Sequence, residues 1–289
     1  PDTTQVKIDP VTGTLIREGV PFIINPFDTQ ALEESLRLKD KYGFRVAVIS
    51  MGPPNTEVTL KKTLALGADE AILLIDRAFG GADTLATSIV LAEAIKRLAQ
   101  NDEIAGVICG KQTIDGDTAQ VGPGIATRLK YSQLTLVDQI QNVDLSAKKV
   151  RVRRKLEGRH EIVEAPLPVM ITVVREINQP RYPTVPMQLM SAEAKVTLWD
   201  NKVMKLPDET IGLKGSVTQV RKIFSPHYLY PILHALCIVA GVFFEEMLKA
   251  RRTAAPAGQS PNVRAVGLTA LLIVIPWMRT FQDALAFTG

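Results

Sequence analysis

Residues 105–129 read AGVICGKQTIDGDTAQVGPGIATRL, an apolar run followed by a polar, glycine-rich stretch and a helical pattern. This order predicts a strand over 105–109, a loop that begins at Gly110, and a helix over 124–129. In α/β folds such loops bind anions, because backbone N–H groups and the dipole of the following helix both favour negative charge there. The loop therefore suits a nucleotide or phosphate site.

A second interpretation of this loop is purely structural. Glycine and aspartate residues in such a connection also serve to reverse the chain and to cap the next helix. Their spacing matches neither the P-loop pattern nor the G-x-G-x-x-G pattern of dinucleotide-binding folds. The residues of the loop alone leave both interpretations open.

The sequence before this loop repeats the strand–helix order. Residues 44–50 (FRVAVIS) and 71–75 (AILLI) are predicted as buried strands. Helical patterns follow over 56–66 and, with Asp83 or Thr84 as the cap, through residue 98. An earlier helix is predicted with Asp28 or Thr29 as its cap. We therefore predict an α/β fold with a mostly parallel sheet and helices on both of its faces.

The pattern beyond residue 134 changes to alternating strands. Residues 137–143, 149–156 and 158–164 are predicted as antiparallel strands at the edge of the parallel sheet, and 169–174 as a buried strand. Residues 2–21 are predicted as a hairpin or a pair of extended segments.

Composition excludes several classes of protein. The chain has 289 residues, a net charge of +4 and two cysteines. These values give no case for a nucleic-acid-binding surface, a disulfide scaffold or a cysteine-rich metal centre. No Ser-His-Asp set, zinc-ligand spacing or pair of catalytic carboxylates is present, so we predict no catalytic and no metal-binding residues. The few cysteines favour a cytoplasmic location.

Residues 178–190 (NQPRYPTVPMQLM) form a proline-rich segment with several apolar residues. The prolines restrict the backbone, so the apolar side chains would be presented to a partner at low entropic cost. Methionine suits a surface that accepts more than one shape. The alternative, a helix entry whose Leu and Met residues pack inward, stays equally open.

Taken together, the motifs resemble the β subunit of electron-transfer flavoprotein, in the order expected for that family from about residue 1 to 226. The resemblance is carried by NPFD at 25–28, MGP at 51–53, LALGAD at 64–69, the loop 110–122, the segment 176–186 with its Pro-Arg-Tyr core, and residues 212–226. It implies an adenine-nucleotide α-hydrolase-like fold and a heterodimer with an α subunit that carries FAD.

The resemblance also implies an adenine nucleotide in this subunit, either AMP or, in electron-bifurcating members, a second FAD. The residues that would line it are Asn25, Pro26, Phe27, Met51, Gly110, Lys111, Thr113, Asp115, Gly116, Asp117, Thr118, Ala119, Gln120 and Val121. Thr118, Gln120 and the N–H groups of residues 116–118 would bind the phosphates.

Gly116 and Ala119 make this loop similar to that of bifurcating members, since AMP-binding members carry bulkier or more polar residues there. Small side chains leave room for a diphosphate and a ribityl chain, so we expect FAD in preference to AMP. The chain is then an electron-carrier subunit whose flavin accepts a hydride from NADH and divides the electron pair between ferredoxin and the α-subunit flavin.

The segment 178–190 corresponds to the family's recognition loop. The resemblance implies that it docks an acyl-CoA dehydrogenase or a membrane quinone oxidoreductase, with Val185 at the apolar tip. The residues expected at this docking site are Tyr182, Thr184, Val185, Pro186, Met187 and Met190.

We expect three regions. Residues 1–190 form the nucleotide-binding domain, 191–226 an arm on the α subunit, and 227–289 an atypical apolar segment. The resemblance also implies a short aliphatic strand ahead of Pro1, which would pair centrally in the sheet and form one wall of the site, so we expect residues to precede Pro1.

The last region departs from the family. Its apolar runs are short against the ~20 residues of a spanning helix. The segment is therefore open to three interpretations: membrane-associated, packed on a partner, or a mispredicted gene end. The alternative functions are a non-redox nucleotide-binding sensor and a membrane-anchored adaptor on the same fold.

Overall fold

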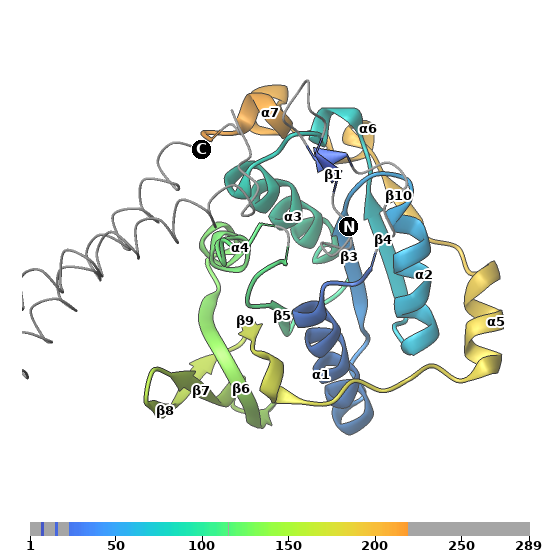
Figure 1. Cartoon of the computed structure of the whole chain (residues 1–289). Coiled ribbons are helices and arrows are strands. Elements are labelled where there is room, and N and C mark those ends of the chain that lie inside the picture. Colours follow the sequence, from blue (N-terminus) through green and yellow to red (C-terminus); the bar gives the residue numbers. More distant parts are fainter. Residues whose placement is uncertain (1–6, 9–14, 17–22, 115, 219–289) are drawn as a thin grey trace, which may run out of the picture. The chain divides into compact units, whose positions relative to one another are not determined.

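The computed structural model describes residues 7–8, 15–16, 23–114 and 116–218 (Figure 1). The strands are β1 (Lys7–Ile8), β2 (Leu15–Ile16), β3 (Ala47–Met51), β4 (Glu70–Leu74), β5 (Gly106–Gly110), β6 (Ser132–Asp144), β7 (Lys149–Leu156), β8 (Arg159–Pro166), β9 (Val169–Val173) and β10 (Thr197–Trp199). The α-helices are α1 (Pro26–Tyr42), α2 (Thr56–Leu66), α3 (Thr84–Leu98), α4 (Val121–Leu129), α5 (Val185–Glu193), α6 (Asn201–Met204) and α7 (Gly212–Gly215). Short 3-10 turns are η2 (Arg77–Phe79), η3 (Arg175–Ile177) and η4 (Asp208–Thr210).

The two larger sheets confirm the predicted α/β class. One has the order β10-β4-β3 and is fully parallel. The other has the order β5-β9-β6-β7-β8, with parallel pairing from β5 to β6 and antiparallel pairing from β6 to β8. The predicted antiparallel strands therefore lie at one edge. The short strands β1 and β2 pair with each other, and the rest of the segment 2–21 lies outside the described residues.

Helices cover both faces of these sheets, as the apolar runs predicted. Ile72 and Leu74 of β4 pack with Val90 of α3, whereas Leu73, between them in sequence, packs with Leu60 of α2. The strand β9 shows the same alternation, with Ile171 in a cluster with Ala31 of α1, and Met170 in a cluster with Ile125 of α4. Successive side chains along a strand point to opposite faces of the sheet, so each central strand is buried on both faces.

Within the described residues, no strand pairs with the outer edges of β3 and β5. Residues of both edges, from Ala47 to Met51 and from Gly106 to Gly110, instead line one cleft. Leu32 of α1 and Leu91 of α3 also line it. The cleft is therefore bounded by two strands and two helices, and its lining extends past both ends of β5, from residues 102–105 before it to residues 111–113 after it.

Two helix starts differ from prediction, and a helix also begins within the proline-rich segment, where the sequence left that question open. The first helix begins at Pro26 with Asn25 at its N-cap, so Asp28 lies inside the first turn and does not cap it. The helix α4 begins at Val121, three residues earlier than predicted. In the segment 178–190, Val185 begins α5, because the hydroxyl of Thr184 accepts a hydrogen bond from the N–H of Met187 and Pro186 suits the first turn.

The segment predicted as an arm from residue 191 contributes β10 to the sheet, where Thr197 pairs with Ile72. Further along the chain, Gly212 lies next to η2 in space. There, the neighbouring residue Leu213 donates its N–H to the carbonyl of Gly80 at 3.0 Å. The domain boundaries remain a prediction. Residues 219–289 lie outside the described residues, and none of the described helices is long and apolar enough to cross a bilayer.

Candidate functional site

The loop after β5 is tied to the first turn of α1. The N–H of Gly110 donates to Oδ1 of Asp28 at 2.7 Å, and Nδ2 of Asn25 donates to the carbonyl of Gln112 at 2.9 Å and to Oδ2 of Asp28 at 2.9 Å. A Cβ on Gly110 would lie 2.5 Å from Cβ of Phe27, so only glycine permits this approach. Two segments more than 80 residues apart thus form one corner of the site.

Asp28 has an unusual environment for a carboxylate. Burial raises its pKa, and although hydrogen bonds from Asn25 and Gly110 lower it, the net pKa lies above the ordinary value. Burial also raises the pKa of the neighbouring Cys109 thiol, with the charge of Asp28 as the second cause. Cys109 is therefore a packing residue rather than a nucleophile.

The loop itself is held by internal bonds. The hydroxyl of Thr113 accepts from the N–H of Gly116 at 3.2 Å, and its carbonyl accepts from the N–H of Asp117 at 3.1 Å. Asp117 and Ala119 both have left-handed φ angles, 52° and 55°. Two of the three N–H groups that we expected to bind phosphate are therefore already bonded within the loop.

The first turn of α4 supplies other donors. Val121 and Gly122 are its first two residues, and both line the cleft. The N–H groups of a first helical turn have no partner within the helix, so they and the helix dipole attract an anion. Gln120 precedes them, and its Oε1 accepts a hydrogen bond of 2.9 Å from the hydroxyl of Thr84, at the start of α3. Nε2 of Gln120 has no hydrogen-bond partner among the described residues, so its N–H groups are available to a ligand.

The structure brings most of the predicted nucleotide-binding residues together. The cleft has a volume of about 920 Å³, within the usual range for ligand sites. Its lining includes Met51, Gly110, Lys111, Thr113, Thr118, Ala119, Gln120 and Val121. Asn25, Pro26, Phe27, Gly116 and Asp117 do not line it, and Asp115 lies outside the described residues.

The residues present fit a nucleotide. Oδ1 of Asn25 is buried and has no hydrogen-bond partner among the described protein atoms, so an acceptor is available beside the loop. Lys111 places its Nζ 5.1 Å from the centre of the Phe27 ring, which adds positive charge next to the site. Donors for phosphate, an unused acceptor and apolar walls therefore adjoin one another.

The predicted docking residues form a second, separate surface. Tyr182 is 93% exposed, Val185 69% and Met190 75%, and Leu189 and Met187 are exposed beside them. The segment enters a helix, as the second interpretation expected, but these side chains are exposed and do not pack inward on the described residues; their docking role stays a prediction. Thr184 and Pro186 are exposed as well, but Thr184 also caps α5.

Sequence reasoning did not assign two residues of the site. Asp28 was read as a helix cap, and Thr84 only as a candidate cap for α3, whose cap is Asp83. A topological signal existed for Thr84: it follows β4 in a parallel sheet, so it lies at the same edge as the loop. No local signal pointed to the bond between Asp28 and Gly110.

This arrangement defines an α/β protein with a cleft that suits a nucleotide and a separate exposed apolar face. Comparisons with known proteins agree: the Electron transfer flavoprotein domain model matches residues 12–203. The chain is 48% identical over 227 residues to Protein FixA of Azotobacter vinelandii, covering 78% of this chain and 81% of the relative. It is 50% identical over 222 residues to Electron transfer flavoprotein subunit beta of Clostridium acetobutylicum, covering 77% and 83%.

A third relative is Caffeyl-CoA reductase-Etf complex subunit CarD of Acetobacterium woodii, 50% identical over 227 residues and covering 78% of this chain and 84% of the relative. The chain therefore belongs to the family of electron-transfer flavoprotein β subunits and FixA proteins. It functions as a component of an electron-transfer flavoprotein. Membership implies a bound flavin or other nucleotide and an α subunit as partner.

Proposed function

We propose that this subunit binds FAD rather than AMP where the loop after β5 and the first turn of α4 line the cleft. The observation that carries the proposal is the combination of that cleft with the small side chain of Ala119, which lines it, and with Gly116 on the exposed part of the same loop. A bulky residue at position 119 would take up space that a diphosphate and a ribityl chain need. A bound FAD would accept a hydride from NADH and release electrons singly, to the α-subunit flavin and to a low-potential acceptor such as ferredoxin.

The chain's own residues bind and orient the nucleotide. The N-terminus of α4, with the amide of Gln120 and the hydroxyl of Thr118, would hold the phosphates. Asn25 would use its unpartnered Oδ1 to accept from a donor on the ligand. Lys111 adds a positive charge that favours a dianionic ligand over a neutral one.

The test is identification of the nucleotide released from the purified complex of this chain and its co-expressed α subunit. Absorbance and mass spectrometry should give two FAD per heterodimer. One FAD and one AMP would overturn the FAD assignment while keeping a nucleotide site. No nucleotide beyond the α-subunit flavin would overturn the site itself.

We propose further that the docking face, Tyr182, Val185, Met187, Leu189 and Met190, binds the electron-donor or electron-acceptor protein. A dehydrogenase acting on acyl-CoA is the first candidate, and a membrane quinone oxidoreductase the second. The name of CarD, which places that relative in a complex with caffeyl-CoA reductase, supports a partner that acts on a CoA thioester. Exposed apolar anchors of this kind dominate the affinity of many interfaces.

A further inference from the structure

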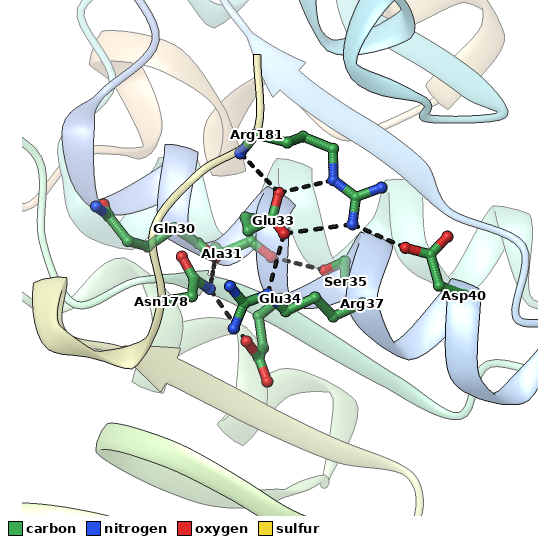
Figure 2. A network of polar contacts seen from close by, with 9 residues as sticks. All are labelled: Gln30, Ala31, Glu33, Glu34, Ser35, Arg37, Asp40, Asn178 and Arg181. Atoms are coloured by element: carbon green, nitrogen blue, oxygen red, sulfur yellow. Dashed lines mark hydrogen bonds and ion pairs between the residues drawn. The ribbon is translucent and has the colours of Figure 1, made fainter. Parts of the chain in front are cut away.

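The segment that precedes the docking face is fastened to α1 by Arg181 (Figure 2). The backbone N–H of Arg181 donates to Oε2 of Glu33 at 3.0 Å, and Nε donates to the same oxygen at 2.9 Å. Nη2 lies 3.3 Å from Oε1 of Glu33 and donates to Asp40 at 2.8 Å. We call these three residues the Arg181 clamp.

We propose that the Arg181 clamp is a positioning device for partner recognition: it fixes where the docking face stands on the molecule. This inference rests on the docking function proposed above. Arg181 touches neither the nucleotide loop nor, by any bond in the described residues, the docking side chains. Its effect on electron transfer would therefore be indirect, through the placement of Tyr182 and of α5.

The clamp is built for rigidity. Glu33 is only 5% exposed, so its bonds to Arg181 are shielded from water and are stronger than those of an exposed pair. Burial raises the pKa of Glu33, but the hydrogen bonds from Arg181 and Arg37 outweigh it, so the net pKa lies below the ordinary value and the carboxylate stays ionised. Arg181 binds Glu33 through its planar guanidinium and through its backbone N–H, so the residue is fixed in orientation as well as in position.

A second bond holds the same segment three residues earlier. Nδ2 of Asn178 donates to the carbonyl of Gln30 at 2.9 Å and to Oε2 of Glu34 at 3.0 Å (Figure 2). The segment is thus attached to α1 at two points before it leaves for Tyr182. Pro183 and Pro186 then restrict the backbone between the clamp and α5. A displacement of Arg181 would therefore also displace Val185.

The other end of α5 is attached to a different helix. Nζ of Lys61 in α2 donates to the carbonyl of Ala192 at 3.3 Å. The docking helix therefore has one fixed point near each end, Arg181 before it and Ala192 at its end. Loss of the clamp would free the N-terminal point, where Tyr182 and Val185 stand, without unfolding α5 itself.

The experiment compares Arg181→Gln with Arg37→Gln in the full chain co-expressed with its α subunit. Arg37 is the matched control: its Nε also donates to Oε1 of Glu33, at 3.0 Å, but it lies within α1 and attaches no other segment. Electron transfer from a purified acyl-CoA dehydrogenase is followed by the absorbance of the flavin, over a range of heterodimer concentrations. Nucleotide content and thermal unfolding are measured for each variant.

Arg181→Gln should raise KM for the heterodimer by roughly tenfold, because charge-assisted hydrogen bonds would no longer order the binding surface. The change in kcat should be less than about twofold. Arg37→Gln should change neither. Arg181→Lys should recover only part of the KM, because lysine keeps the charge but not the fork. Nucleotide content should match the wild type in all three, since the clamp lies away from the loop.

An equal KM in Arg181→Gln and Arg37→Gln would overturn the positioning role of the Arg181 clamp but would not contradict the docking proposal. A loss of kcat together with nucleotide in Arg181→Gln would also overturn it, because that result describes a role in folding alone. If the wild-type heterodimer shows no saturable transfer with the dehydrogenase, both the docking proposal and the clamp fall.

Discussion

A single carboxylate, that of Asp28, joins the first turn of α1 to the end of β5. It accepts from the N–H of Gly110 and from Nδ2 of Asn25, so its removal would leave two donors without a partner. Local rules for helix starts assign such an aspartate to capping, because they see only the residues around it. The partner that gives Asp28 its role lies 82 positions away.

Asp28→Ala should lower the free energy of unfolding by about 2 kcal/mol, the cost of leaving buried donors unsatisfied, and should reduce nucleotide content. Asp28→Asn should lower it less, since Oδ1 still accepts from Gly110. The pKa of Asp28 is raised in the folded protein, so the contribution of this group to stability is present at acid pH and declines as the pH rises through the raised value. Urea unfolding from pH 4 to 7 should show the wild type losing stability relative to Asp28→Asn; a difference that does not vary with pH would contradict this assignment.

Two glycines of the loop should differ sharply when changed to alanine. In Gly110→Ala the new Cβ would meet backbone atoms of Phe27 and Asp28 at 2.8 and 2.9 Å, and these cannot move without displacing α1. In Gly116→Ala it would meet only the hydroxyl of Thr113 at 3.1 Å. We expect a loss of at least about 2 kcal/mol for the first and under about 1 kcal/mol for the second, measured by chemical unfolding. Equal losses would show that the close approach at Gly110 is not a constraint.

At the scale of whole elements, the sequence predicted the central strands and helices well, because burial on two faces leaves continuous apolar runs such as residues 71–75. It predicted Asp83 or Thr84 as the cap of α3, and the structure shows that the cap is Asp83. Helix α5 was less predictable: prolines around Val185 favour a loop, and only the Thr184 cap points the other way. Long-range hydrogen bonds, such as that from Thr84 to Gln120, produce no periodic pattern in the sequence.

The start of α3 should control the affinity for nucleotide through one bond. Thr84→Val removes the hydroxyl that donates to Gln120 but leaves the cap of α3 intact, because Asp83 accepts from the N–H of Ala86 at 3.0 Å. Affinity should fall by about 2- to 10-fold, the value of one neutral hydrogen bond. Thr87→Val, three residues along the same helix, is the control; Thr87 lines the cleft, whereas Thr84 reaches it only through Gln120. Calorimetric titration of the nucleotide-free heterodimer measures both; equal affinities would remove Thr84 from the site.

Helix α5 should matter for the partner and not for the cofactor. Val185→Asp places a charge on the docking face, so electron transfer with a dehydrogenase should slow at least about tenfold, as for the loss of an interface anchor. Val58→Asp is the matched control, since Val58 of α2 is 63% exposed against 69% for Val185 and lies outside that face. Flavin content should be unchanged in both. Equal slowing by both variants would mean that general charge, not the face, sets the rate.

At the scale of the molecule, the described strands form a three-stranded and a five-stranded sheet whose nearest edges, β3 and β5, line the same cleft. Unpaired edges of aliphatic strands are costly, because their N–H and C=O groups lack partners and invite association. The cleft walls are apolar where α1 and α3 face it, at Leu32 and Leu91. One parallel strand of about five aliphatic residues between β3 and β5 would supply partners for both edges.

Extending the chain ahead of Pro1 with a short alternating Val/Ile stretch should therefore raise stability and lower aggregation, compared with a Gly/Ser extension of the same length. The gain comes from new ladder hydrogen bonds to β3 and β5 and from aliphatic side chains that meet α1 on one face and α3 on the other. Hydrogen exchange should slow at the amides of Ile49 and Ile108, whose N–H groups point away from the neighbouring strand, and remain unchanged at Leu73, which already pairs on both sides. If the two extensions give the same exchange at Ile49 and Ile108, the cleft does not accept a strand, and its whole volume belongs to the ligand.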